Sequence, residues 1–180
     1  MIDHITDIVR EPLSFKRSLY HLLLVDDDPA LLDALSGTLR SRLTHFELDT
    51  CESGTKALDL VRSKMYDTII LDVNLPNMNG LQVLTAVKQM RSTTPVLMIT
   101  AQADPPLMMK ALEAGAEDFI AKPFDREEFV RAVRQSLELS RLQSVVVKLE
   151  ARQRKTSEQL GVVRERLHQH ALRTLKNKHR

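Results

Sequence analysis

Three carboxylates, a hydroxyl and an amine could together bind a metal ion and a phosphoryl group, provided that the fold brings them close. The residues are Asp26, Asp27, Asp72, Thr100 and Lys122. Clustered carboxylates repel one another unless a cation lies among them, and oxygen ligands select a hard cation such as Mg²⁺. A lysine and a hydroxyl beside that cation could neutralise the charge of a phosphoryl group while a carboxylate attacks it in line.

Strand-like runs alternate with helix-like stretches over about 120 residues, which is typical of an α/β fold. The strand-like runs are rich in branched and aromatic residues and lie at Leu22–Val25, Phe46–Thr50, Thr68–Leu71, Val96–Thr100 and Phe119–Ala121. Stretches with helical spacing lie between them, at residues 29–42, 54–64, 80–90 and 107–114. The middle runs are almost continuously apolar, as strands buried on both faces require. We therefore predict a doubly wound, five-stranded parallel sheet with helices on both sides.

The expected chemistry lies at one edge of this sheet, because ligands bind at the carboxyl ends of the strands in open parallel sheets. The polar residues that end or closely follow the predicted strands are Asp26, Asp27, Asp72, Thr100 and Lys122. Asp28 also follows the first strand, but Pro29 comes directly after it, which is typical of a helix N-cap. We expect Asp28 to cap that helix and not to bind a ligand.

Four motifs at these strand ends resemble the receiver domain of two-component response regulators. They are Val25–Pro29, Ile69–Pro76, Met98–Ala101 and Gly115–Phe124, and the resemblance covers about residues 20–140. It implies a flavodoxin-like strand order, 2-1-3-4-5. It also implies a sensor histidine kinase or phosphotransfer protein as partner. The domain would not be an enzyme in the ordinary sense, since it would catalyse only its own phosphorylation and dephosphorylation.

The resemblance implies a role for each acidic residue. Asp72 would be the phosphoacceptor, which attacks the phosphohistidine of the partner. The Mg²⁺ cofactor would be coordinated by Asp27, Asp72 and the backbone carbonyl of Asn74, with Asp26 acting through a water molecule. A receiver that keeps the fold without the chemistry would lack some of these residues, and all of them are present.

The remaining motif residues would bind the phosphoryl group and signal its arrival. Lys122 would pair with a phosphoryl oxygen, and the backbone amides of Asn74 and Ala101 would complete the cradle. Thr100 would reorient inward, and Phe119 would follow it, although a phenylalanine there could also simply belong to the core. Lys122-Pro123 resembles the cis peptide of the family. Asn74 and Gln102 would flank the path of the water that hydrolyses the phosphoryl group.

Composition excludes several other classes of protein. The chain has 180 residues, of which 43% are hydrophobic and 28% are charged, so wholesale disorder is not expected. The single cysteine, Cys51, excludes an internal disulfide framework and a multi-cysteine zinc site. The longest apolar runs are too short to span a bilayer, and the amino terminus carries Asp3 and Asp7 without the apolar core of a signal peptide. We expect a cytoplasmic protein with no membrane association.

The net charge of +2 conceals two regions of opposite sign. Residues 1–140 hold 15 Lys and Arg against 21 Asp and Glu, which gives −6, whereas residues 141–180 hold 11 against 3, which gives +8. We predict an N-terminal extension over 1–18, a receiver domain over 19–138 and a basic helical tail over 139–180, continuous with the last receiver helix. Within the extension, Ile2, Ile5, Ile8 and Val9 could form one or two amphipathic turns.

The tail carries a heptad pattern that predicts a two-stranded coiled coil and a homodimer through residues 139–175. The last receiver helix should begin near Asp125, where Glu128 three residues later completes a capping-box spacing. The a and d positions are Leu139, Leu142, Val146, Leu149, Gln153, Thr156, Leu160, Val163, Leu167, His170 and Thr174. Seven of the eleven are apolar, and the polar ones weaken the middle and the end. Gly161 falls on the outer face and costs about 1 kcal/mol of helix propensity.

Three interpretations of the tail compete. The favoured one is a dimerising helix that transmits the signal of the receiver domain. The signal could end in an effector domain, in which case the chain would be the N-terminal fragment of a receiver–effector protein. In the second, the +8 charge binds nucleic acid or an acidic partner, which would make the protein a phosphorylation-controlled nucleic-acid-binding regulator. In the third, residues 170–175 resemble a phosphohistidine box, but Ala171 replaces its acidic residue and no proline follows Thr174.

Overall fold

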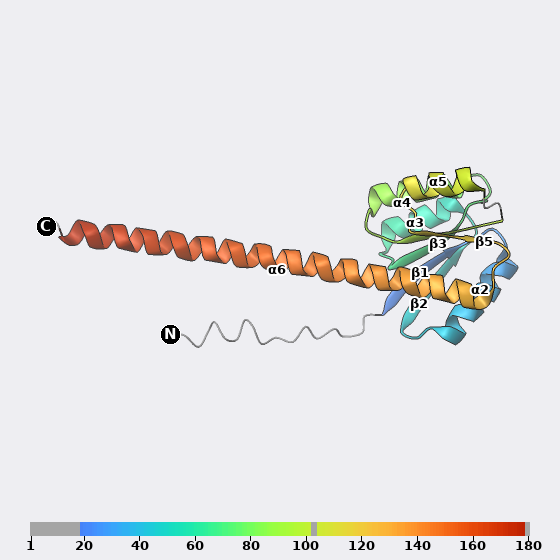
Figure 1. Cartoon of the computed structure of the whole chain (residues 1–180), viewed down its shortest axis with the longest axis horizontal. Coiled ribbons are helices and arrows are strands. Elements are labelled where there is room, and N and C mark those ends of the chain that lie inside the picture. The colour runs from blue at the N-terminus through green and yellow to red at the C-terminus, as the bar shows by residue number, and fades with distance from the viewer. Residues whose placement is uncertain (1–18, 102–103, 179–180) are drawn as a thin grey trace. The chain divides into compact units, whose positions relative to one another are not determined.

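The computed structural model describes residues 19–101 and 104–178, with side chains up to His168. Its strands are β1 (Tyr20–Val25), β2 (Phe46–Cys51), β3 (Thr68–Asp72), β4 (Val96–Thr100) and β5 (Asp118–Ala121). Its helices are α2 (Pro29–Arg42), α3 (Gly54–Ser63), α4 (Gly80–Met90), α5 (Pro105–Glu113) and α6 (Arg126–Lys178). All strand pairs are parallel and the sheet order is β2-β1-β3-β4-β5 (Figure 1), so the predicted fold and order are confirmed.

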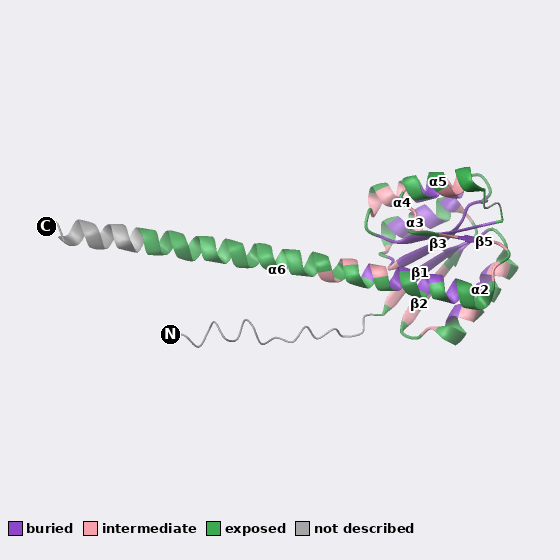
Figure 2. Ribbon diagram, in the orientation of Figure 1, coloured by how far each residue is buried: buried purple, intermediate pink, exposed green. Residues whose placement is uncertain are grey.

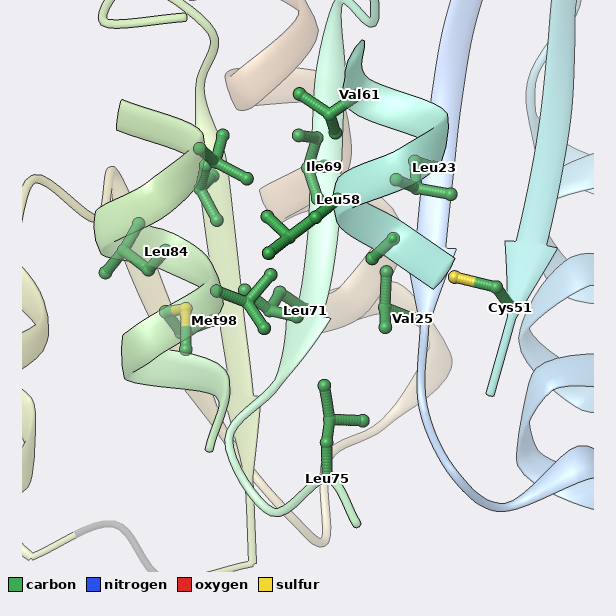
Figure 3. Packing of buried hydrophobic residues seen from close by; sticks show 14 of the residues in the cluster. Leu23, Val25, Cys51, Leu58, Val61, Ile69, Leu71, Leu75, Leu84 and Met98 are labelled. Atoms are coloured by element: carbon green, nitrogen blue, oxygen red, sulfur yellow. The ribbon is translucent and has the colours of Figure 1, made fainter. Parts of the chain in front are cut away.

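Two layers of helices cover the sheet because neighbouring residues of a strand point to opposite faces. On one face, Leu23, Leu71 and Met98 pack with Leu58 of α3 and Leu84 of α4 (Figure 3). The second core cluster covers the opposite face. Its members include strand residues Leu24, Ile70 and Ile99, Leu35 of α2 and Val133 of α6. The three central strands are therefore buried on both faces, which explains their almost continuous apolar sequence.

Local capping sets where the helices begin. The carboxylate of Asp28 accepts hydrogen bonds from the backbone N–H groups of Ala30 and Leu31 at the start of α2. Asp125 accepts one from the N–H of Glu128 at the start of α6, at 2.7 Å. Helix α5 begins at Pro105, two residues before its predicted start, because Asp104 caps it through the N–H of Leu107.

Strand β1 begins two residues earlier than the apolar run predicts. Tyr20 and His21 pair with Phe46 and Glu47 on β2, and they are only half-buried. Because these two residues are not fully apolar, hydrophobicity alone does not place them in the strand.

The chain divides into two compact units between Ser140 and Arg141. In the first unit, α6 is tied to the start of β3 by a buried contact of 3.0 Å between the hydroxyls of Ser136 and Thr68. In the second unit, exposed side chains predominate as far as His168 (Figure 2). The predicted extension, residues 1–18, and Gln102 lie outside the described residues. Among those that are described, no helix combines the length and the hydrophobicity needed to cross a bilayer.

Candidate functional site

The polar residues predicted to gather at one edge of the sheet do lie at the carboxyl ends of its strands. Asp26 follows β1, Asp72 ends β3 and Thr100 ends β4. Lys122 follows β5 directly, and its backbone N–H donates to the carbonyl of Thr100 at 2.7 Å. Residues separated by up to 96 positions in the sequence therefore share one rim.

An ammonium group joins the two buried carboxylates. Lys122 Nζ donates to Asp26 Oδ2 and to Asp72 Oδ1, each at 2.7 Å. Each of the two carboxylate side chains is 3% exposed, whereas that of Lys122 is 24% exposed. The contact is thus a buried ion pair with one excess negative charge, and its lysine is reached by solvent.

Backbone groups hold the other oxygens of both carboxylates. Asp26 Oδ1 accepts from the N–H of Asp28 at 3.0 Å, and Asp72 Oδ2 accepts from the N–H of Asn74. Each of the four carboxylate oxygens therefore has a hydrogen-bond donor, which fixes the orientation of both groups. Because a carboxylate oxygen has two lone pairs, each can still accept a further ligand.

The pKa values of Asp72 and Lys122 reflect this burial. Burial raises the pKa of Asp72, and the negative charge of Asp26 raises it further, against the lowering effect of Lys122 and of the Asn74 amide. Burial lowers the pKa of Lys122, but its hydrogen bonds and charge interactions with Asp26 and Asp72 outweigh that effect and raise it. Lys122 is therefore a cation at neutral pH, and Asp72 is a more basic carboxylate than an exposed aspartate.

Residues 22–134 match the family model of the response regulator receiver domain. The chain belongs to this family. It is 36% identical to the response regulator protein TodT of Pseudomonas putida over 119 residues, which are 66% of this chain and 52% of TodT. It is 39% identical to the response regulator ArlR of Staphylococcus aureus over 115 residues, 63% of this chain and 50% of ArlR. The chain thus spans about half the length of these curated relatives.

A solved receiver domain has the same architecture. The BeF3-activated receiver domain of DrrB, from Thermotoga maritima, aligns with a TM-score of 0.61 and 29% identity. The alignment covers 67% of this chain and 98% of that domain. The fold and the family of residues 22–134 are thereby established, and these residues lie within the first of the two compact units.

The metal ligands implied for the receiver domain are only partly gathered. Asp26 and Asp72 meet through Lys122, whereas Asp27 and Asn74 are exposed. Within residues 19–101 and 104–168, no three His, Cys, Asp or Glu side chains converge as a metal site would require. The donor chemistry nevertheless fits a hard cation, since carboxylate and carbonyl oxygens are the ligands it prefers.

The switch residues implied for the receiver domain differ in their surroundings. Thr100 is fully buried, whereas Ala101 is exposed. Phe119 is partly buried and packs against the core cluster beneath α3, α4 and α5. This position is compatible with both roles considered for Phe119, that of a core residue and that of a switch residue.

Two contacts of the site are not predicted by the sequence. At Gly80, the first residue of α4, a Cβ would collide with the backbone carbonyl of Asp72. The Lys122–Pro123 peptide is cis, as the family resemblance implies. Just beyond it, the ring of Phe124 stacks on Phe129 of α6 with 5.6 Å between ring centroids. The stacking anchors the segment that carries Lys122. The only sign of this contact in the sequence is that the motif Gly115–Phe124 ends with Phe124.

Proposed function

We propose that Asp72 accepts a phosphoryl group from the phosphohistidine of a sensor histidine kinase or phosphotransfer protein, in a reaction that depends on Mg²⁺. The observation that carries this proposal is the ion pair of Lys122 with two buried carboxylates at the carboxyl ends of β1 and β3. An ion pair with no chemical role is an expensive feature to bury, because desolvation offsets much of its attraction.

The geometry supports a direct attack by the Asp72 carboxylate. A carboxylate oxygen forms a bond to phosphorus as the phosphorus–nitrogen bond of the phosphohistidine breaks, and the imidazole leaves with that electron pair. Lys122 Nζ, already 2.7 Å from Asp72 Oδ1, would contact the oxygens of the arriving group and neutralise part of their charge. The side chain of Lys122 is 24% exposed and is therefore open to an arriving group.

The ligands proposed for Mg²⁺ are Asp27, Asp72 and the carbonyl of Asn74, with Asp26 through water. When bound, the cation would offset the negative charge that the phosphoryl group adds to an already anionic site. Asp26 and Asp72 are held in place by Lys122 and by backbone N–H groups. Their spare lone pairs leave them able to bind the cation without giving up those bonds.

The proposed output passes from the receiver through the last helix. Thr100 would turn toward the phosphoryl group and Phe119 would follow, which would alter the packing beneath α4 and α5. The tail would transmit this change as a dimerising helix. Support for pairing comes from six apolar heptad residues of 47–66% exposure: Leu142, Val146, Leu149, Leu160, Val163 and Leu167. Exposed apolar residues in a heptad pattern find their burial in a second helix.

The test is phosphorylation of the full chain with a small-molecule phosphodonor, with and without Mg²⁺, read by intact-protein mass spectrometry. We expect one added phosphoryl group in the presence of Mg²⁺ and none in excess chelator. Asp72→Asn should abolish it. The matched control is Asp28→Asn, which changes a neighbouring carboxylate but keeps a good helix cap. Equal labelling of Asp72→Asn and of the unmodified sequence would show that the site is assigned wrongly.

A further inference from the structure

The heptad residues of the tail read the same in both directions. From Leu142 to Leu167 the a and d positions are Leu142, Val146, Leu149, Gln153, Thr156, Leu160, Val163 and Leu167. Leucine, valine and leucine lead to a polar centre, and leucine, valine and leucine follow it. The intervals of four and three residues are symmetric about the same centre. A helix with this pattern is complementary to a copy of itself that runs in the opposite direction.

A hollow on the helix surface coincides with the centre of the pattern. It is lined by Leu149, Arg152, Gln153, Thr156, Ser157 and Leu160. All six occupy the a, d, e or g positions that face a partner helix in a coiled coil. In such pairs, each a or d side chain of one helix enters a hole between four residues of the other. The hollow therefore provides room for the two central side chains of a partner.

The hydrogen bond of Thr156 distinguishes the two possible directions of that partner. Thr156 Oγ1 donates to the carbonyl of Arg152 at 3.0 Å, which uses its only proton. In a parallel, in-register pair, the two Thr156 oxygens would face each other as acceptors with no donor between them. In an antiparallel pair, each would face the amide of the partner's Gln153, which has N–H groups to donate. The antiparallel arrangement therefore gives each Thr156 oxygen a donor in its own layer, which the parallel, in-register arrangement does not.

The order of leucine and valine leads to the same arrangement. Valine at a with leucine at d favours parallel dimers, and Val146 and Leu149 follow that rule. Beyond the centre the order is reversed, with Leu160 at a and Val163 at d. A parallel pair would therefore have one favourable half and one unfavourable half. In an antiparallel pair each apolar layer joins one a residue and one d residue of the same type.

From these observations we infer that the partner of the tail is a second copy of this chain, paired antiparallel over residues 142–167. The twofold axis passes between Gln153 and Thr156. Val146 then packs on the partner's Val163, and Leu149 packs on the partner's Leu160. Charge is compatible with this register, because Arg152 would lie beside the partner's Gln159 and Glu150 beside the partner's Ser157. The inference rests on the dimerising helix of the proposed function and adds its direction and register.

Disulfide cross-linking of the full chain tests the direction. The variants are Val146→Cys and Val163→Cys, the second with a tag that makes it larger. In the antiparallel pair, the two copies of residue 146 lie about 25 Å apart along the axis, at 1.5 Å per residue. A disulfide needs Cα atoms within about 7 Å. Neither variant should cross-link alone, whereas a mixture that has exchanged subunits should give a mixed disulfide. Cys51 is 3% exposed, so the unmodified sequence is the control for background oxidation.

Each other outcome overturns the inference in a recognisable way. Efficient self-linking of Val146→Cys would mean a parallel pair, which keeps the dimerising helix but rejects its direction. A chain that sediments as a monomer at micromolar concentration would reject the dimer itself, and a dimer without the mixed disulfide would reject the register. Leu149→Cys with Leu160→Cys provides a second pair in case the first disturbs packing. Phosphoryl labelling of Asp72 in the same preparations reports separately on the proposed phosphoacceptor.

Discussion

Lys122→Met should destabilise the receiver domain by about 3 kcal/mol at neutral pH. The substitution keeps most of the side-chain volume and removes the ammonium that lies 2.7 Å from both Asp26 and Asp72. Those contacts place the two carboxylates within about 5 Å of each other, where two unit charges repel by about 3 kcal/mol at an effective dielectric constant near 20. Protonation of one carboxyl limits the loss to about 4 kcal/mol at pH 7.

The assay is urea unfolding followed by circular dichroism, at pH 7.5 and again near pH 4. The loss of stability in Lys122→Met should shrink at the lower pH, because one carboxyl group can then take up a proton and the repulsion between the two disappears. Lys64→Met is the matched control, since Lys64 also contacts two carboxylates, those of Glu47 and Asp49. The side chains of Glu47 and Asp49 are 53% and 34% exposed. Lys64→Met should therefore lower the free energy of unfolding by only about 0–1 kcal/mol. Equal losses for the two variants would refute the argument that burial decides the cost.

Four further predictions concern single residues. Asp72→Asn should raise the free energy of unfolding at pH 7, because burial makes the charge of Asp72 costly in the folded state. Because the pKa of Asp72 is raised in the folded state, ionisation of Asp72 opposes folding as the pH rises above 3.8. The extra stability of Asp72→Asn should therefore vanish in acid. Urea unfolding at several pH values measures this. Gly80→Ala should lower stability by more than 2 kcal/mol through its collision with the Asp72 carbonyl. Gly37→Ala, with open space around its Cβ, should instead raise stability by about 1 kcal/mol in the same urea assay. Gly161→Ala should raise the helix content of the tail, seen by circular dichroism, since nothing lies within 4 Å of the added Cβ.

The fold was predictable because its information is local and repeated. Five strand-like runs and the helical spacing between them indicate a parallel sheet. A parallel sheet brings the carboxyl ends of its strands to one edge. Asp72 and Lys122 could therefore be placed together from sequence, although 50 residues separate them. Boundaries were less certain at β1 and α5, where a half-buried pair of residues and a cap decide the first residue.

What sequence could not supply is the detailed geometry within the site. No pattern indicates that one lysine bonds two carboxylates at once, or that Asp27 is exposed while Asp26 is buried. The need for glycine at position 80 is equally hidden, because it arises from the approach of α4 to the carbonyl of a residue on β3. Such details depend on distances between elements, which sequence spacing does not encode. Thr100, Phe119 and the metal ligands stay predictions in their functional roles.

The connection between the site and α6 follows from two contacts at opposite ends of the sheet. At the carboxyl end, Phe124 stacks on Phe129, so the segment that carries Lys122 is packed on the first turn of the helix. At the other end, the hydroxyl of Ser136 meets that of Thr68, the first residue of β3, whose last residue is Asp72. Two positions within the first eleven residues of α6 are thus fixed, Phe129 to the segment that carries Lys122 and Ser136 to the strand of the proposed phosphoacceptor. If Lys122 shifts to meet a phosphoryl group while β3 stays in place, the strain falls on the start of α6. Because the same helix continues to Lys178, this would give the chemistry of the receiver domain a second route to the tail, beside the proposed one through Thr100 and Phe119.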